Sequence, residues 1–382
     1  MPLETIIAGV MVASLVLYAL LGGADYGGGV WDLLAFGRRA REQRALIADA
    51  ISPVWEANHV WLILVVVILF TAFPPAFAAI ATALHIPITL LLIGIVLRGT
   101  AFTFRTYDVQ HDTVQRRWSL VFSIASIITP ILLGTTLGAI ASGTIRVENG
   151  FVASGFFRSW LAPFPLAVGF FALALFAFLA AVYLTVEAER RELQDAERRD
   201  LRAAERRELR EVEGWGLQED FRLRALAAGG VVGLLALTVF VLAKTGAPTV
   251  RAGISRTGWA LGLHFFTAIF ATGAFVTLWT RRYRVARVCA AAQVTLILLG
   301  WAFAQFPHLV EPDLTITSAA APQITLELLL AALAAGALLL FPSYYYLFRI
   351  FKAASPPNVR RALPFAAASP PDVRRGSASP DD

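Results

Sequence analysis

Carboxyl and imidazole side chains lie unusually close to two long apolar runs of this sequence. Asp25 follows the first run, Glu56 opens the second, and His59 comes three residues after Glu56. Residues three apart share a helix face, so Glu56 and His59 form a titratable pair. Polar groups within or beside a membrane span are costly and are therefore default candidates for function. The chemistry that suits these residue types is proton transfer, with Asp25, Glu56 and His59 as relay candidates.

Both carboxylates also have a structural interpretation. Ser52 can cap a helix that begins with Pro53, and the helix dipole favours a carboxylate such as Glu56 in that first turn. Asp25 stands among five glycines between positions 22 and 29. These glycines permit either a close approach of neighbouring helices or an unwound helix end. In the second case Asp25 is a surface group that ends the helix.

Two arginines lie in or just after the third apolar run. Arg98 lies inside it and Arg105 follows near its end. Arg98 can extend to the membrane surface along its apolar stem, or it can pair with Asp25 or Glu56 at the same depth. The arginines and the neighbours of the relay candidates are supporting candidates: Trp55, Asn58, Trp61, Arg98 and Arg105.

Neither the histidines nor the cysteine form a ligand set. His85, His264 and His308 are isolated at the ends of runs or in a loop, and no two histidines have ligand spacing within one run. Cys289 is the single cysteine, which excludes a disulfide and a CxxC site. We therefore expect this chain to ligate no metal and no haem.

The composition predicts an all-α, polytopic membrane protein. Of 382 residues, 57% are hydrophobic and only 16% are charged, against about 25% in soluble domains. The net charge of +6 does not indicate nucleic-acid binding, because the arginines cluster in short segments between apolar runs. A span takes roughly 20 apolar residues, and its backbone must be helical. Nine runs qualify, near residues 5–23, 54–74, 77–103, 119–141, 163–186, 225–243, 259–279, 286–305 and 325–348.

Loops rich in arginine alternate with loops that have few basic residues. The loops at 38–44, 105–117 and 281–287 are rich, whereas those at 73–76 and 307–324 contain no lysine or arginine. The loop at 73–76 contains two prolines and predicts a tight turn between the second and third runs. The alternation places the N-terminus outside and the C-terminus in the cytoplasm.

Two segments are predicted to lie outside the membrane, between or after the span regions 1–186 and 225–350. Residues 187–224 mix Glu, Asp and Arg at helical spacing, which predicts a charged cytoplasmic helical loop or a docking site for another protein. Residues 351–382 contain two copies of an Ala-Ser-Pro-Pro unit followed by Asn or Asp, Val, Arg and Arg. This composition predicts a disordered cytoplasmic tail.

The order of these motifs resembles subunit II of the cytochrome bd-type terminal oxidases. The stretch Ala24–Gly29 is similar to the glycine motif that ends the family's first span. The stretch Pro53–Leu62 is similar to the family's Pro-x-Trp-Asp-Gly-Asn-x-Val-Trp-Leu element, and Arg98, Phe102 and Arg105 match its arginine pattern. The sequence departs from that pattern at several positions: Gly22, Glu56, Ala57 and His59. The resemblance covers the chain except its tail and indicates a divergent branch.

The resemblance implies two four-helix bundles plus a peripheral helix, packed against a similarly folded subunit I in a prokaryotic plasma membrane. Subunit I would hold the b-type and d-type haems and the quinol site, with a small accessory subunit as a further possible partner. This chain would ligate no haem, would support the complex and could hold a structural quinone. In some members the position of Glu56 lines a cytoplasmic proton path, so the resemblance implies that role here.

Two other functions are compatible with the residues. A proton-coupled secondary transporter would use intramembrane carboxylates, although the sequence shows no inverted repeat. A purely structural membrane subunit differs only in giving Glu56 no proton role. The transporter hypothesis predicts a chain that is stable alone, whereas the oxidase hypothesis predicts a haem-bearing partner.

Overall fold

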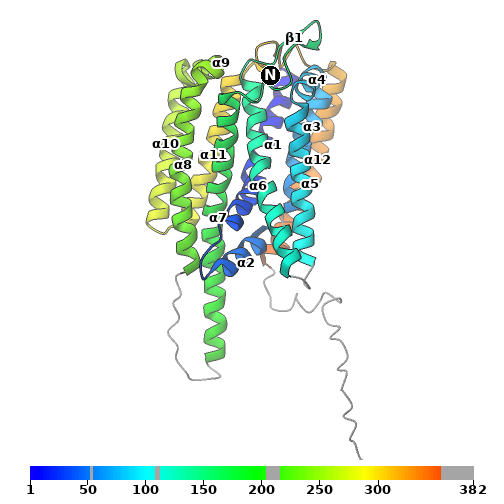
Figure 1. Ribbon diagram of the computed structural model, residues 1–382. Coiled ribbons are helices and arrows are strands. Elements are labelled where there is room, and N and C mark those ends of the chain that lie inside the picture. Colours follow the sequence, from blue (N-terminus) through cyan, green and yellow to red (C-terminus); the bar gives the residue numbers. More distant parts are fainter. Residues whose placement is uncertain (52–54, 108–111, 204–215, 354–382) are drawn as a thin grey trace, which may run out of the picture. The chain divides into compact units, whose positions relative to one another are not determined.

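The computed structural model describes residues 1–51, 55–107, 112–203 and 216–353. These residues form helices connected by short loops and two small hairpins (Figure 1). The chain divides into two units, Met1–Leu330 and Ala331–Asp382, and each is described by itself. Most of the predicted tail lies outside the described residues.

The helices follow one another in this order: α1 (Leu3–Leu33), α2 (Ala40–Ile51), α3 (Trp55–Ala72), α4 (Pro74–Ala83), α5 (His85–Tyr107), α6 (Asp112–Ala141), α7 (Pro163–Ala203), α8 (Gly216–Gly246), α9 (Pro248–Arg256), α10 (Gly258–Trp279), α11 (Tyr283–Gln305) and α12 (Gln323–Ala353). Two antiparallel hairpins lie in loops: β1 (Val147–Glu148) with β2 (Phe151–Val152), and β3 (His308–Val310) with β4 (Leu314–Thr315).

Eight of the described helices are long and apolar enough to cross a membrane, and α3 with the bent α4 forms a possible ninth span. This confirms the all-α polytopic class, while the arrangement in two four-helix bundles stays a prediction. The third predicted run, 77–103, began too early. Residues 74–83 form the separate helix α4, bent by 118° from α3, because the prolines that follow Phe73 start a new helix. The third span begins at His85.

Glycines let α1 approach its neighbours at backbone distance. A Cβ atom on Gly27 would lie 1.9 Å from the carbonyl oxygen of Phe176 in α7, and one on Gly29 would lie 2.2 Å from the Cβ of Ser126 in α6. The helix continues without interruption to Leu33. Of the two interpretations of the glycine stretch, close helix packing is therefore correct and an unwound end is wrong.

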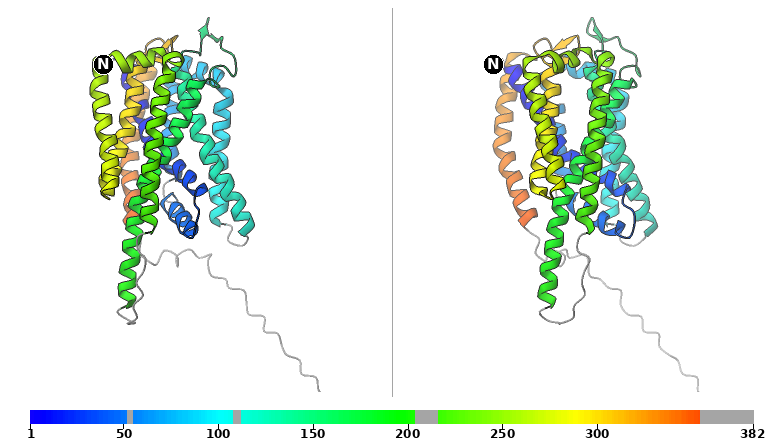
Figure 2. Two further views of the ribbon diagram at one scale, coloured as in Figure 1. Left: turned by 60° about the vertical axis from the view of Figure 1, so that its left-hand side comes forward. Right: turned by 90° about the vertical axis from the view of Figure 1, so that its left-hand side faces the viewer.

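The two ends of the helices in Met1–Leu330 differ (Figure 1). The N-terminus, α4, α9 and the hairpin of β1 lie at one end. At the opposite end lie α2 and the last turns of α7, which extend past the neighbouring helices (Figure 2). Part of the charged segment 187–224 thus continues α7 as far as Ala203 and another part opens α8 at Gly216. An ion pair of 3.5 Å between Arg191 and Asp49 joins the α7 extension to α2.

Candidate functional site: buried polar residues between α1, α3, α5 and α6

Asp25 lies on the glycine-rich face of α1 and is only 6% exposed. Its Oδ2 accepts a hydrogen bond of 2.5 Å from Nδ2 of Asn58, which is 1% exposed in α3. Most of the glycines around Asp25 face other helices, since an added Cβ there would meet Ile51 of α2, Ser126 of α6 or Phe176 of α7. A buried carboxylate is tolerated only when such donors satisfy it.

Arg98 supplies a positive charge to the same region. Its side chain is 1% exposed, and its Nε donates a hydrogen bond of 3.2 Å to Oγ of Ser126 in α6. The guanidinium carbon lies 4.6 Å from the centre of the Tyr26 ring, a cation–π distance. Arg98 also interacts electrostatically with Asp25. The arginine is thus buried between helices and does not extend to the membrane surface.

His59 faces two tyrosines of α1. Its ring centre lies 6.0 Å from that of Tyr18 and 6.2 Å from that of Tyr26, and the two tyrosine hydroxyls are 3.3 Å apart. The Nδ1 atom of His59 is buried and makes no hydrogen bond to the residues that the structure describes. The neighbouring Trp61 is also buried, at 5% exposure. The histidine thus joins the buried polar group of Asp25 on its aromatic side.

Three of the predicted site residues have side chains outside the described part of the structure: Trp55, Glu56 and Arg105. Their backbones belong to α3 and α5. The proton role of Glu56 stays a prediction that rests on its sequence position.

Asp32 is a buried carboxylate that the sequence interpretation missed. It is 2% exposed and accepts a hydrogen bond of 3.2 Å from Oγ of Ser123 in α6. Asp32 follows Asp25 by seven residues, so the two share a face of α1 and lie roughly 10 Å apart along its axis. The seven-residue spacing from Asp25 is the feature of the sequence that could have identified Asp32. Asp32 lies near the end of α1 that adjoins α2, and Asp25 lies two turns deeper in the helix. The two carboxylates therefore form a line of polar groups along α1.

Histidines outside this cluster make local contacts. Nδ1 of His85 lies 2.9 Å from the carbonyl oxygen of Thr82, and Nδ1 of His308 lies 3.2 Å from Oε2 of Glu311. Within the described residues no group of three or more His, Cys, Asp or Glu side chains is placed to hold a metal ion. The buried polar cluster therefore offers hydrogen-bonding and titratable groups, which suit proton movement.

Comparisons with known proteins match one protein family over most of the chain. The sequence model of the family "Cytochrome bd terminal oxidase subunit II" matches residues 3–205 and 209–351. A Bacillus subtilis protein named "Putative cytochrome bd menaquinol oxidase subunit II" is 22% identical over 88% of this chain and 91% of its own length. The Escherichia coli "Cytochrome bd-I ubiquinol oxidase subunit 2" is 27% identical over 44% of this chain and 45% of its own.

A solved structure shares the fold. A chain of the bd oxidase from Geobacillus thermodenitrificans superposes with a TM-score of 0.70 at 21% identity, covering 93% of this chain and 100% of that one. At 21% sequence identity, the similarity between the two structures shows a common fold and nothing further.

Proposed function

Since the chain belongs to the cytochrome bd terminal oxidase subunit II family, we propose that it supports a haem-bearing subunit I and lines a cytoplasmic proton path for the reduction of oxygen to water. The chain is a multi-span membrane protein of a respiratory oxidase. We place it in a prokaryotic plasma membrane with its N-terminus outside and its C-terminus in the cytoplasm. The partner would complete a heterodimer, with a small accessory subunit as a further component.

The observation that carries the proton role is the burial of Asp25 between helices. A carboxylate at this position is 6% exposed, hydrogen-bonded to Asn58 and close to the buried Arg98. Keeping such a group within a span is expensive for stability, and it is retained most often where ions or protons pass.

The geometry suggests a direction for the path. Asp32 lies near the end of α1 where α2 begins, and Asp25 lies two turns deeper. Protons would be taken up near Asp32, pass to Asp25 and Glu56, and leave toward the partner subunit. His59, beside the tyrosines, would add a hydrogen bond or a further relay group.

The redox chemistry would take place in the partner. Haems of the b and d types held by subunit I would carry electrons to oxygen, with a quinol as donor. The names of two relatives mention menaquinol and ubiquinol oxidases, which supports a quinol donor without choosing between the two quinols. A structural quinone bound by this chain remains part of the proposal.

The family match argues against the transporter hypothesis, because the described spans follow the oxidase subunit along most of the chain. The purely structural subunit is still a competing function. It predicts that buried carboxylates can be neutralised without loss of turnover, so the same experiment separates the two.

The test is Asp25→Asn and Glu56→Gln in the complex purified through a tag on this chain. We expect oxygen consumption to fall about a hundredfold, as when a proton-transferring group is lost, while the reduced-minus-oxidised haem spectrum is unchanged. Glu148→Gln is the control, because Glu148 is an exposed carboxylate of β1 and lies outside the candidate spans. Turnover near wild type in both variants, with intact haems, would establish the purely structural role. A colourless chain that purifies alone would contradict the oxidase assignment itself.

A further inference from the structure

A cavity of about 800 Å³ opens at the α2 end of Met1–Leu330, apart from the cluster around Asp25. It is formed by the loop after α1, the start of α2 and the first turns of α8. Its lining includes three arginines and two carboxylates: Arg38, Arg39, Arg224, Glu42 and Asp220. The described lining therefore carries a net positive charge.

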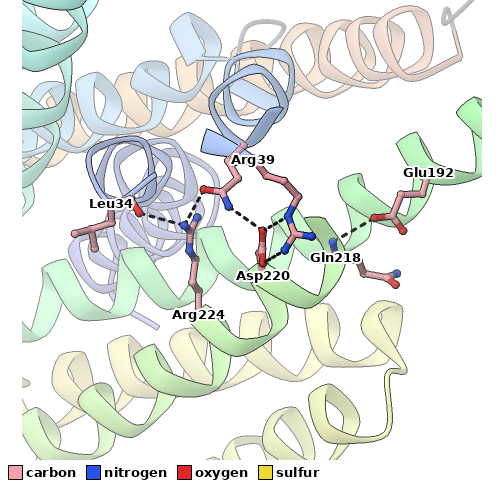
Figure 3. A network of polar contacts seen from close by, with 7 residues as sticks. Leu34, Arg39, Glu192, Gln218, Asp220 and Arg224 are labelled. Atoms are coloured by element: carbon pink, nitrogen blue, oxygen red, sulfur yellow. Dashed lines mark hydrogen bonds and ion pairs between the residues drawn. The ribbon is translucent and has the colours of Figure 1, made fainter. Parts of the chain in front are cut away.

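One of the arginines is matched by a carboxylate. Nε and Nη2 of Arg39 donate to the two oxygens of Asp220, at 3.1 and 2.7 Å. Nε2 of Gln43 donates a further hydrogen bond of 2.8 Å to the same carboxylate (Figure 3). This network joins α2 to α8 and fixes one wall of the cavity.

Arg224 makes no direct ion pair with the described residues, and Asp220, which interacts with it electrostatically, is already bound by Arg39. Its Nη2 donates to two neutral oxygens, the carbonyl of Leu34 at 3.1 Å and Oε1 of Gln43 at 2.9 Å (Figure 3). Its Nη1 atom is buried and makes no hydrogen bond to the described residues. The guanidinium carbon also lies 5.2 Å from the centre of the Phe221 ring, which holds the group in place. A fixed guanidinium with donors to spare is suited to a phosphate oxygen.

The rim of the cavity is apolar. Phe36 is 76% exposed and Leu223 is 54% exposed, and both line the cavity. Leu33 and Leu34, at the end of α1, are also exposed. These residues lie where the spans α1 and α8 reach the membrane surface, so their side chains can contact hydrocarbon.

We propose that this cavity binds the headgroup of an anionic phospholipid, with its phosphate against Arg224 and Arg38 and its acyl chains along Phe36 and Leu223. A free phosphate ion shares the phosphate chemistry but would not use the apolar rim. A zwitterionic lipid would use the rim but would bring its own positive charge to the arginines. The lining of the cavity includes none of the residues proposed for the proton path, so the two proposals can fail independently.

The experiment compares lipid retention by the purified complex and its variants. Detergent-stripped complex is reconstituted into nanodiscs of phosphatidylcholine alone or of phosphatidylcholine with phosphatidylglycerol, released again, and its bound lipid is counted by native mass spectrometry. We expect wild type to retain phosphatidylglycerol selectively. Arg224→Gln should lower that retention about tenfold or more, as expected for a lost charged hydrogen bond. Arg224→Lys should retain less phosphatidylglycerol than wild type and more than Arg224→Gln.

Arg284→Gln is the matched control, because Arg284 is an exposed arginine at the start of α11 and does not line the cavity. It should retain lipid as wild type does. If Arg224→Gln does not assemble, Arg38→Gln tests the same cavity from an exposed position. Equal retention of phosphatidylglycerol by wild type and the cavity variants would refute the site. If wild type retained phosphatidylcholine as well as phosphatidylglycerol, or if inorganic phosphate alone displaced the lipid, the assignment of the site to an anionic lipid would be refuted.

Discussion

Asp25, Asn58 and Arg98 come from three different helices, and each depends on the others. The amide of Asn58 donates to Asp25, and Arg98 lies close enough to the same carboxylate to interact with it. Water is scarce among buried helices, so removing one partner leaves another polar group without compensation. Residues in one buried network are therefore expected to affect stability non-additively.

A double-mutant cycle measures this dependence. Asp25→Asn and Arg98→Leu should each destabilise the complex, and the double variant should lose less than the sum, with a coupling energy of about 0.5–3 kcal/mol. The free energy of unfolding is measured by detergent titration of the purified complex. Arg98→Leu combined with Glu148→Gln should be additive, because Glu148 is exposed and lies outside the spans. Additive losses in the Asp25 cycle would mean that the two side chains do not interact.

The candidate site could be predicted from the sequence only in part. Asp25, Asn58 and Arg98 were recognisable because polar residues are conspicuous inside apolar runs, and the structure brings them together. Asp32 was missed because its burial depends on Ser123, which is 91 residues away in the sequence. Local spacing shows which helix face a residue occupies but not which distant helix covers that face.

At the scale of the element, the packing of α1 against α7 depends on the absence of a side chain at one position. The Cβ of an alanine at Gly27 would fall 1.9 Å from the backbone oxygen of Phe176. A backbone carbonyl cannot rotate out of the way as a side chain can, so the helices themselves must separate.

Gly27→Ala should therefore destabilise the complex by about 1–3 kcal/mol, the usual range for overpacking. The measurement is the midpoint of thermal unfolding of the purified complex, together with its yield. Gly9→Ala lies on the same helix with no atom within 4 Å of its added Cβ, and it should leave the yield unchanged and the midpoint unchanged or slightly raised, because alanine favours the helix over glycine. An unchanged midpoint in Gly27→Ala would show that α1 and α7 are not held at this distance.

The positions of most helices could be predicted from the sequence. The exception is the start of the third span, and it has a physical cause. Residues 77–103 are mostly apolar on both sides of the break at Leu84, and the polar mark at the break is limited to His85, followed by Pro87. The break at Leu84, with ψ of 21°, and the reversal at Phe73 separate α4 from both neighbours. The two prolines signalled a turn, but they equally begin a new helix, and the sequence does not distinguish these outcomes.

On the scale of the whole molecule, the charge distribution separates the two ends of the helices. In the arrangement of Met1–Leu330, α2 and the junction of α10 with α11 lie at one end, and the N-terminus lies at the other (Figures 1 and 2). The arginines of both segments are thus on one side, and they outnumber the basic residues at the other end, among them Arg251 and Arg256 of α9. Cytoplasmic loops carry the excess of arginine and lysine, so this distribution predicts that the N-terminus is external.

Cysteine labelling tests the orientation. In a Cys289→Ser background, Gly155→Cys should react with a membrane-impermeant thiol reagent in intact cells, whereas Arg282→Cys should react only after permeabilisation. Both positions are exposed, so accessibility on each side is limited by the membrane alone. The reverse labelling pattern would invert the topology and place the proposed proton uptake on the outer side.

The contact between α1 and α7 also has a consequence for how the protein is made. Nε1 of Trp31 donates a hydrogen bond of 2.8 Å to the carbonyl of Ala177, across 146 residues of sequence. Ribosomes add about 5–20 residues per second, so α7 follows α1 by roughly 7–30 s. Throughout that interval the nascent chain holds the glycines of α1 that face Phe176 without their final neighbour. We expect the newly inserted α1 to be the part of the nascent chain most exposed to membrane proteases, although it is among the best covered helices of the finished protein.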